Sequence, residues 1–225
     1  QKGHLLIDSQ ADGFYQFIDQ TEKYPQAEIM ECEGLTALKA LSNGHHHAYS
    51  SLARGMPFRS SPPKSFIEIL EKVWWNLDKN LSAEMNEISA YYTAISSAKN
   101  GVASIIDPHS SPFAIKGSLS KMYQAIHKCG LDSILCYEIS DRDGVNIREQ
   151  GLEESNAYLS SHQGLVGLHA SFTLEDETLE KAFRLAQKHN SGIHIHLAES
   201  ISDQVDSELK HGQRVVNRLN SFGFL

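Results

Sequence analysis

The sequence has few cysteines and no long apolar run. Its three cysteines, Cys32, Cys129 and Cys136, are odd in number and show no paired spacing, which fits a reducing cytoplasm. No apolar run approaches the roughly 20 residues of a membrane span, and no signal peptide is visible after Gln1. We therefore predict a cytoplasmic protein without a membrane partner.

Positive charge is also scarce. The 225 residues include 20 Lys and Arg against 28 Asp and Glu, for a formal net charge of -8, and no basic stretch stands out. Nucleic-acid-binding proteins carry clustered basic side chains, so nucleic acid is not predicted as a partner. A hydrophobic content of 40% and this length predict a globular protein with one large or two small domains.

Histidine, by contrast, is abundant, with twelve in the chain. The stretch "NGHHHAYSSLARGMP" (43–57) places three of them in a row. Side chains two apart on a strand point to the same side. If the preceding residues form a strand, His45 and His47 lie on the same face and can bind one metal ion together, and His46 points away.

Strand-like and helix-like segments alternate along most of the chain. Continuous apolar runs, typical of parallel strands covered on both faces, occur at 35–43, 101–107, 132–139, 164–170 and 191–199. Helical patterns occur at 65–81, 83–101, 118–130, 146–161, 174–190 and 203–223. Residues 1–34 differ, because strand-like pieces at 3–19 and 26–34 are separated by polar turns.

Polar residues lie where these strands end. Their position helps to choose between two architectures, a doubly wound sheet and a (β/α)₈ barrel. These residues are His45, His47, Asp107, His109, Glu138, Asp141, His169, His196 and Glu199. Side chains from several consecutive strand ends converge on one point if the sheet curls into a barrel. No GxGxxG turn supports a doubly wound nucleotide-binding sheet. The pattern therefore favours an α/β fold of the (β/α)₈ TIM type.

The strand-end histidines have the chemistry of a metal site. Zinc binds neutral imidazole, and a catalytic zinc keeps one position open for water. "HIHLAE" repeats the first pattern, with His194 and His196 on one face and Glu199 three residues on, where a carboxylate could move protons. Taken singly, each residue also fits a surface, core or helix-leading role. Their combination favours the metal site.

At this point three segments, "SNGHHHAYSSLARGMP", "GLHASFTL" and "HIHLAES", resemble the amidohydrolase superfamily. The nearest branch contains cytosine and guanine deaminases, S-adenosylhomocysteine deaminases, chlorohydrolases and related aminohydrolases. "KVWWNLD" and "CYEISDRDG" extend the resemblance over nearly the whole chain. It implies a (β/α)₈ barrel flanked by a small β-sandwich. Residues 1–34 would be part of that sandwich, and residues 35–225 the first five strand–helix units of the barrel.

The resemblance also implies a site with one divalent ion. One ion is implied because "VGLHASF" lacks the lysine of binuclear members. Its ligands would be His45, His47 and His196, with zinc the first choice and iron the second. Glu199 matches a proton-shuttling glutamate, and His169 matches a histidine that contacts substrate. Small-molecule substrates are implied, and homodimers are common in the family.

Sequence position indicates two further candidate substrate-binding residues. Arg54 and Trp75 lie near the first histidine pair, so we expect them to line the mouth of the site and bind substrate. The sequence also differs from the family pattern in two ways. "LTALKALSNG" lacks the proline–glycine turn of the family. The chain also ends at Leu225, before the histidine of strand six and the aspartate of strand eight that the family needs. We therefore expect it to be part of a longer protein, or its ordered portion.

The sequence thus predicts a metal-dependent hydrolase of non-peptide C–N bonds, in which a metal-activated water deaminates a heterocyclic or amidine-like substrate. Three alternatives stay open. The same site could remove chlorine or hydrolyse an exocyclic amide. The chain could be a truncated, inactive metal-binding module. It could also be a metal-free doubly wound protein with scattered histidines.

Overall fold

The computed structural model describes residues 3–8, 15–57 and 61–225. Contacts within the chain divide it into two compact units, residues 1–39 and 40–225. The expected division at residue 34 therefore lies five residues before the observed one.

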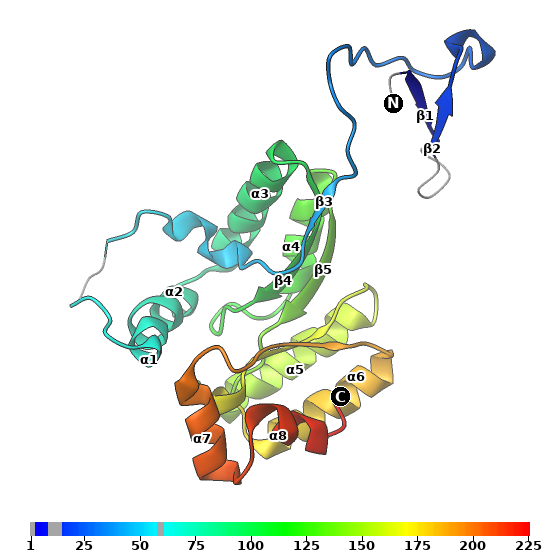
Figure 1. The fold of residues 1–225 in the computed structure, drawn as a ribbon. Coiled ribbons are helices and arrows are strands. Elements are labelled where there is room, and N and C mark those ends of the chain that lie inside the picture. Colours follow the sequence, from blue (N-terminus) through cyan, green and yellow to red (C-terminus); the bar gives the residue numbers. More distant parts are fainter. Residues whose placement is uncertain (1–2, 9–14, 58–60) are drawn as a thin grey trace. The chain divides into compact units, whose positions relative to one another are not determined.

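The N-terminal unit contains a β-hairpin. β1 (His4–Ile7) pairs antiparallel with β2 (Tyr15–Ile18), and a 3-10 turn, η1 (Thr21–Lys23), follows (Figure 1). The polar turn expected between the strands includes residues 9–14, which lie outside the described residues. The strand expected within 26–34 does not form, because no described strand pairs with that backbone.

The larger unit is built on parallel strands that follow one another in chain order. They are β3 (Leu41–Asn43), β4 (Val102–His109), β5 (Asp132–Tyr137), β6 (Val166–Ala170) and β7 (Ile193–His196). β3, β4 and β5 form one hydrogen-bonded sheet, and β6 and β7 form another. Parallel bridges from Leu135 to Gly164 and from Ile139 to Leu168 connect the two. The alternating strand–helix pattern is confirmed, although the described strands do not close into a barrel.

Helices separate these strands and cover the sheet. They are α1 (Phe66–Ile69), α2 (Trp75–Lys79), α3 (Ala83–Lys99), α4 (Ser118–Lys128), α5 (Val145–Leu159), α6 (Asp176–His189), α7 (Ile201–His211) and α8 (Val215–Ser221). A π-helical turn, η3 (Leu70–Trp74), joins α1 to α2, and η2 (Ala48–Ala53) and η4 (Ser171–Thr173) are 3-10 turns. Residues 203–223, which were predicted to be largely helical, contain two helices, because Gly212 ends α7 in the left-handed conformation, with φ at 67°.

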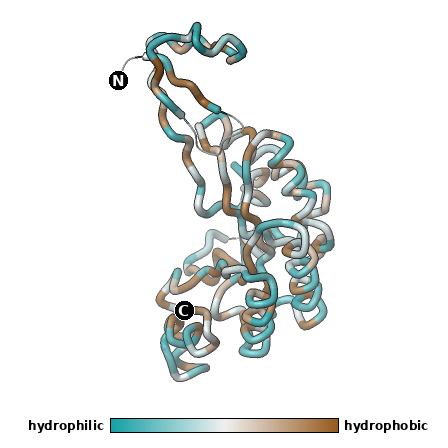
Figure 2. Tube along the Cα trace, turned by 90° about the vertical axis from the view of Figure 1, so that its right-hand side faces the viewer, coloured by the Kyte–Doolittle hydropathy of each residue, from teal (hydrophilic) through white to brown (hydrophobic). Residues whose placement is uncertain are grey.

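The core lies between the strands and these helices. Leu119, Met122 and Ile126 of α4 are fully buried together with strand residues such as Leu135 and Leu168. Figure 2 shows hydrophobic residues concentrated along the strands and more hydrophilic ones on the outer helices. This distribution is the expected one for a parallel sheet that is covered by helices.

β6 can approach β5 closely because it carries a glycine. A Cβ on Gly167 would overlap the carbonyl group of Tyr137 on β5. The bridge between Ile139 and Leu168 lies beside this contact. Gly167 therefore allows β6 to continue the sheet from β5, which brings the ends of both strands to the same edge.

The first parallel strand is shorter than expected. A strand was predicted over 35–43, whereas β3 begins at Leu41. Leu41 pairs with Val102, the first residue of β4, so residues 35–40 have no strand beside them. Among the described residues, no helix is long and apolar enough to cross a membrane.

Candidate metal centre

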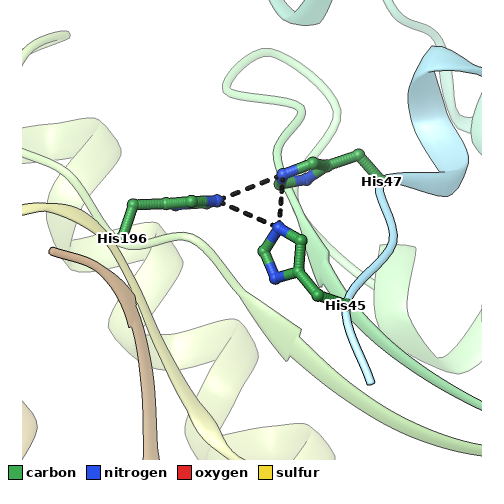
Figure 3. Close-up of side chains that lie close together, drawn as sticks. All are labelled: His45, His47 and His196. Carbon is green, nitrogen blue, oxygen red and sulfur yellow. Dashed lines mark hydrogen bonds between the residues drawn. The ribbon is translucent and has the colours of Figure 1, made fainter. Parts of the chain in front are cut away.

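Histidines from the first and last parallel strands meet at one point. His45 and His47 follow β3, and His196 is the last residue of β7 (Figure 3). Their Nε2 atoms are 3.2 Å apart for His45 and His47, 3.2 Å for His47 and His196, and 3.3 Å for His196 and His45. Donor atoms 2.0–2.1 Å from a tetrahedral zinc ion lie about 3.3–3.4 Å from one another. The three nitrogens therefore fit one zinc-sized ion.

The loop that carries the first two histidines is fixed by β4. The backbone N–H of His46 donates to the carbonyl oxygen of Ile106 at 3.0 Å. The backbone N–H of Ala48 donates to Oδ2 of Asp107 at 2.6 Å. Asp107 is fully buried, and burial raises its pKa to about 7, although the bond from Ala48 opposes that shift.

Two of the three imidazoles are oriented by carbonyl groups. Nδ1 of His47 donates to the carbonyl oxygen of Pro108 at 2.9 Å, and Nδ1 of His196 donates to that of His169 at 2.8 Å. A carbonyl oxygen can only accept, so the ring proton is on Nδ1 in both residues. The Nε2 lone pairs are therefore free to bind a metal.

The cluster favours neutral imidazoles. Burial, followed by repulsion from His196, lowers the pKa of His47 to about 3. Burial and His196 also lower the pKa of His45, while Glu199 opposes the shift. The pKa of His194, whose Nε2 lies 2.8 Å from Nδ1 of His45, is lowered to about 4, chiefly by burial. Zinc binds neutral imidazole, so protons do not block His47 near pH 7.

A buried carboxyl lies behind two of the histidines. Glu138 follows β5, and its Oε1 is 3.4 Å from Nδ1 of His196 and 3.9 Å from Nδ1 of His47. Its side chain is 1% exposed, and among the described residues this oxygen has no hydrogen-bond partner. Burial raises the pKa of Glu138 well above its usual range, and Arg142 opposes that shift. The sequence pattern identified Glu138 only as a strand-end residue.

A cavity of about 210 Å³ contains the candidate catalytic groups beside the histidine cluster. Its lining is formed by His45, His47, Tyr49, Phe66, Leu70, Trp74, Glu138, His169, Ala170, His196 and Glu199. His169 is buried, with Nδ1 2.9 Å from Oγ1 of Thr173, and Glu199 is exposed. The fold therefore brings both predicted catalytic residues to the predicted ligands.

The predicted tryptophan lies behind the cavity instead of lining it. The ring of Trp75 is 6.1 Å from the ring of His169, and the guanidinium of Arg142 lies 5.2 Å from the centre of the Trp75 ring. The wall is formed by the neighbouring Trp74, whose ring is 5.7 Å from that of His47. Trp75 is therefore next to His169 and is not among the residues that line the cavity.

Arg54 lies in a different place from the one expected. It lines a separate cavity of about 350 Å³, together with residues of α3 and with Asn43 and His46. The 3-10 turn η2 carries the chain away from the cluster immediately after His47. Nearness in sequence to the histidine pair therefore does not place Arg54 at its mouth.

Sequence reasoning missed a buried ion-pair network next to Trp75. Arg142 forms ion pairs with Asp78 and Asp143, and the hydroxyl of Ser110 donates to Oδ2 of Asp78 at 2.9 Å. Asp78 is almost fully buried, as is the side chain of Arg142. The segments "KVWWNLD" and "CYEISDRDG" contain these charges, which gives both a physical role in supporting the cavity wall.

These observations define an α/β protein in which three histidines that could hold a metal ion meet at the carboxyl ends of parallel strands. Residues 37–225 match the model of the Amidohydrolase family. The chain belongs to that family.

Relatives and structures of the same kind agree with this assignment. The chain is 28% identical to a 5'-deoxyadenosine deaminase of Methanopyrus kandleri, covering 98% of this chain and 51% of the relative. It is 27% identical to a 5-methylthioadenosine/S-adenosylhomocysteine deaminase of Syntrophomonas wolfei, covering 99% and 50%. The chain therefore spans about half the length of the curated relatives it matches.

Two solved structures show the same fold at low identity. A guanine deaminase from C. acetobutylicum with bound guanine has a TM-score of 0.76 at 12% identity, covering 96% of this chain and 57% of that one. A zinc-bound adenosine deaminase from Xanthomonas campestris has a TM-score of 0.69 at 17% identity, covering 83% and 42%. At these identities the likeness concerns the fold alone.

Proposed function

We propose that the protein is a metal-dependent hydrolase that deaminates a small heterocyclic substrate, with an adenosine derivative as the first candidate. The observation that carries this proposal is the convergence of the Nε2 atoms of His45, His47 and His196. It lies in a cavity that also contains Glu199 and His169. The names of the relatives supply the substrate class.

His45, His47 and His196 would hold one divalent ion, zinc first and iron second, because three neutral imidazoles suit either metal. A bound zinc ion lowers the pKa of water to about 7 and so supplies a nucleophile at neutral pH. Glu199 would move the two protons of the attacking water, one to the ring nitrogen of the substrate and one to the departing amino group. Hydrolysis would then replace the C–N bond by a C–O bond on the ring carbon and release ammonia.

His169 would orient the substrate and stabilise the charge that develops on it. Its ring borders the cavity, and Trp75 and Thr173 hold it in place. Burial and the positive charge of Arg142 lower the pKa of His169 well below its usual range. A neutral imidazole can donate a hydrogen bond from one nitrogen while it accepts at the other.

The remaining parts of the proposal concern architecture and surroundings. We place the sheet of the larger unit in a (β/α)₈ barrel, with the strand order β3 to β7 as the first five strands. The hairpin of β1 and β2 would belong to a small β-sandwich. A cytoplasmic location is supported by free Cys32, Cys129 and Cys136. Homodimer formation rests on the resemblance alone.

The test combines metal analysis with an ammonia-release assay. Purified protein loaded with zinc is given 5'-deoxyadenosine, methylthioadenosine, S-adenosylhomocysteine, guanine and a chlorotriazine. We expect one zinc ion per chain and ammonia from an adenosine derivative. Glu199→Gln should keep its zinc and lose about 10²–10⁴-fold in rate, the usual contribution of a positioned acid–base group.

Other outcomes have distinct meanings. Chloride release without ammonia would replace deamination by dechlorination at the same site. One bound zinc without turnover of any compound would support the inactive metal-binding module. A protein that binds neither zinc nor iron contradicts the proposal.

A further inference from the structure

Each proposed metal ligand is held through its Nδ1 atom, but one of them is held by a different kind of group. The acceptors behind His47 and His196 are backbone carbonyls, as described above. His45 follows the three-residue strand β3 and has an exposed side chain. Behind it lies another side chain, the imidazole of His194 on β7.

The contact between these two histidines has the geometry of a hydrogen bond. Nδ1 of His45 and Nε2 of His194 are 2.8 Å apart. The ring centroids are 5.1 Å apart, and the ring planes differ by 21°. For Nε2 of His45 to face the cluster with a free lone pair, its proton must be on Nδ1, where it donates to Nε2 of His194.

We propose that His194 is a positioning residue for the metal centre, because it accepts the proton of Nδ1 of His45 and so fixes the tautomer and ring orientation of that ligand. The proposal rests on the metal site of the proposed function. β7 would then contribute two residues to the site. His196 would be a ligand, and His194 would support the ligand His45, which is 149 residues away from it in sequence.

His194 does not belong to the ligand set itself. The group whose donor atoms could hold one ion consists of His45, His47 and His196. Nε2 of His194 lies within hydrogen-bond distance of Nδ1 of His45, so it is used by that contact. An acceptor behind a metal-bound histidine raises its basicity, and its loss commonly weakens metal binding about 10–100-fold.

Two substitutions distinguish the effect of the hydrogen-bond acceptor of His194 from the effect of its aromatic ring. His194→Phe keeps an aromatic ring and removes the acceptor, whereas His194→Gln places an amide oxygen near the position of Nε2. His46→Phe is the matched control, because His46 lies between two ligands in sequence but its side chain lines the other cavity. Far-UV circular dichroism confirms that each variant is folded.

Zinc affinity is measured at pH 7.5 by competition with a chromogenic chelator. We expect His194→Phe to bind zinc about 10–100-fold more weakly than the wild type. His194→Gln should stay within about threefold, as should His46→Phe. Wild-type affinity in His194→Phe would overturn the proposal. So would equal weakening in His194→Gln and His194→Phe, because the restored acceptor would then have no effect.

A second measurement does not depend on metal. Long-range ¹H–¹⁵N spectra of the metal-free protein report which ring nitrogen of His45 carries the proton. We expect the Nδ1–H form in the wild type and in His194→Gln, and a mixture of both forms in His194→Phe. A wild-type His45 protonated on Nε2 would overturn the assignment even if zinc binds. The expected tautomer in a protein that binds no zinc would contradict the proposed function alone.

Discussion

Zinc binding to this site should release fewer protons than binding to an ordinary set of three histidines. At pH 6 a histidine with a pKa of 6.5 is about three-quarters protonated, so three such ligands would release about 2.3 protons. Burial lowers the pKa of His47 to about 3, so at pH 6 this residue has almost no proton to release. The number released should therefore fall below that reference by about three-quarters of a proton because of His47 alone. The lowered pKa of His45 reduces that number further.

Isothermal titration calorimetry measures the number directly. Zinc is titrated at pH 6 into the protein in two buffers of different ionisation enthalpy, and the difference in heat gives the protons released. The control is His46→Phe, whose three ligands are intact, and it should give the wild-type number. A release of more than two protons would mean that His47 titrates like an exposed histidine, which would refute the inference from its burial.

Three further changes should have measurable effects. Glu138→Gln replaces a buried carboxyl group that lies 3.4 Å from Nδ1 of His196 and that a bound cation would favour in its ionised form. This change should weaken zinc binding about 10-fold or more, and unchanged affinity in a chelator competition would contradict it. Asp107 keeps a proton when folded up to its pKa of about 7 but loses it near 3.8 when unfolded. Its contribution to stability therefore falls as pH rises between these values, by on the order of 4 kcal/mol. Urea unfolding of wild type and Asp107→Asn across that range should show the difference narrowing toward low pH, and a constant difference would argue against it. Gly167→Ala forces β6 away from the Tyr137 carbonyl and should lower the melting temperature by several degrees, whereas an unchanged temperature would mean that β6 can shift freely.

The ligand histidines could be found in the sequence because their spacing follows a local rule. Alternation along a strand predicted a shared side for His45 and His47, and their rings do meet although both residues lie in the loop after β3. A strand-end position brings His196 to the same edge of the sheet. Nothing local indicates that Glu138 lies behind two of these residues. Its role depends on how the sheet brings the end of β5 to His47 and His196, which are far from Glu138 in sequence.

The sequence-based predictions were wrong where the position of a side chain depends on the path of a loop or turn. Arg54 is only seven residues from His47, yet the 3-10 turn between them directs it into another cavity. The expected strand before the histidines is cut short, since residues 35–40 have no partner where β4 begins. Trp75 was predicted at the mouth of the site, whereas Trp74, the last residue of the π-helical turn, lines the cavity.

The separation of the ligands along the chain ties metal occupancy to the completion of folding. His47 and His196 are 149 residues apart; His47 follows β3 and His196 ends β7, the first and last of the described parallel strands. In an unfolded chain, closing a loop of that length is costly in entropy, so no high-affinity site exists before the strands between them have assembled. A metal present at a thousand times its dissociation constant would stabilise the assembled state by about 4 kcal/mol. The zinc retained by a sample would therefore count the molecules in which all five parallel strands have reached their places.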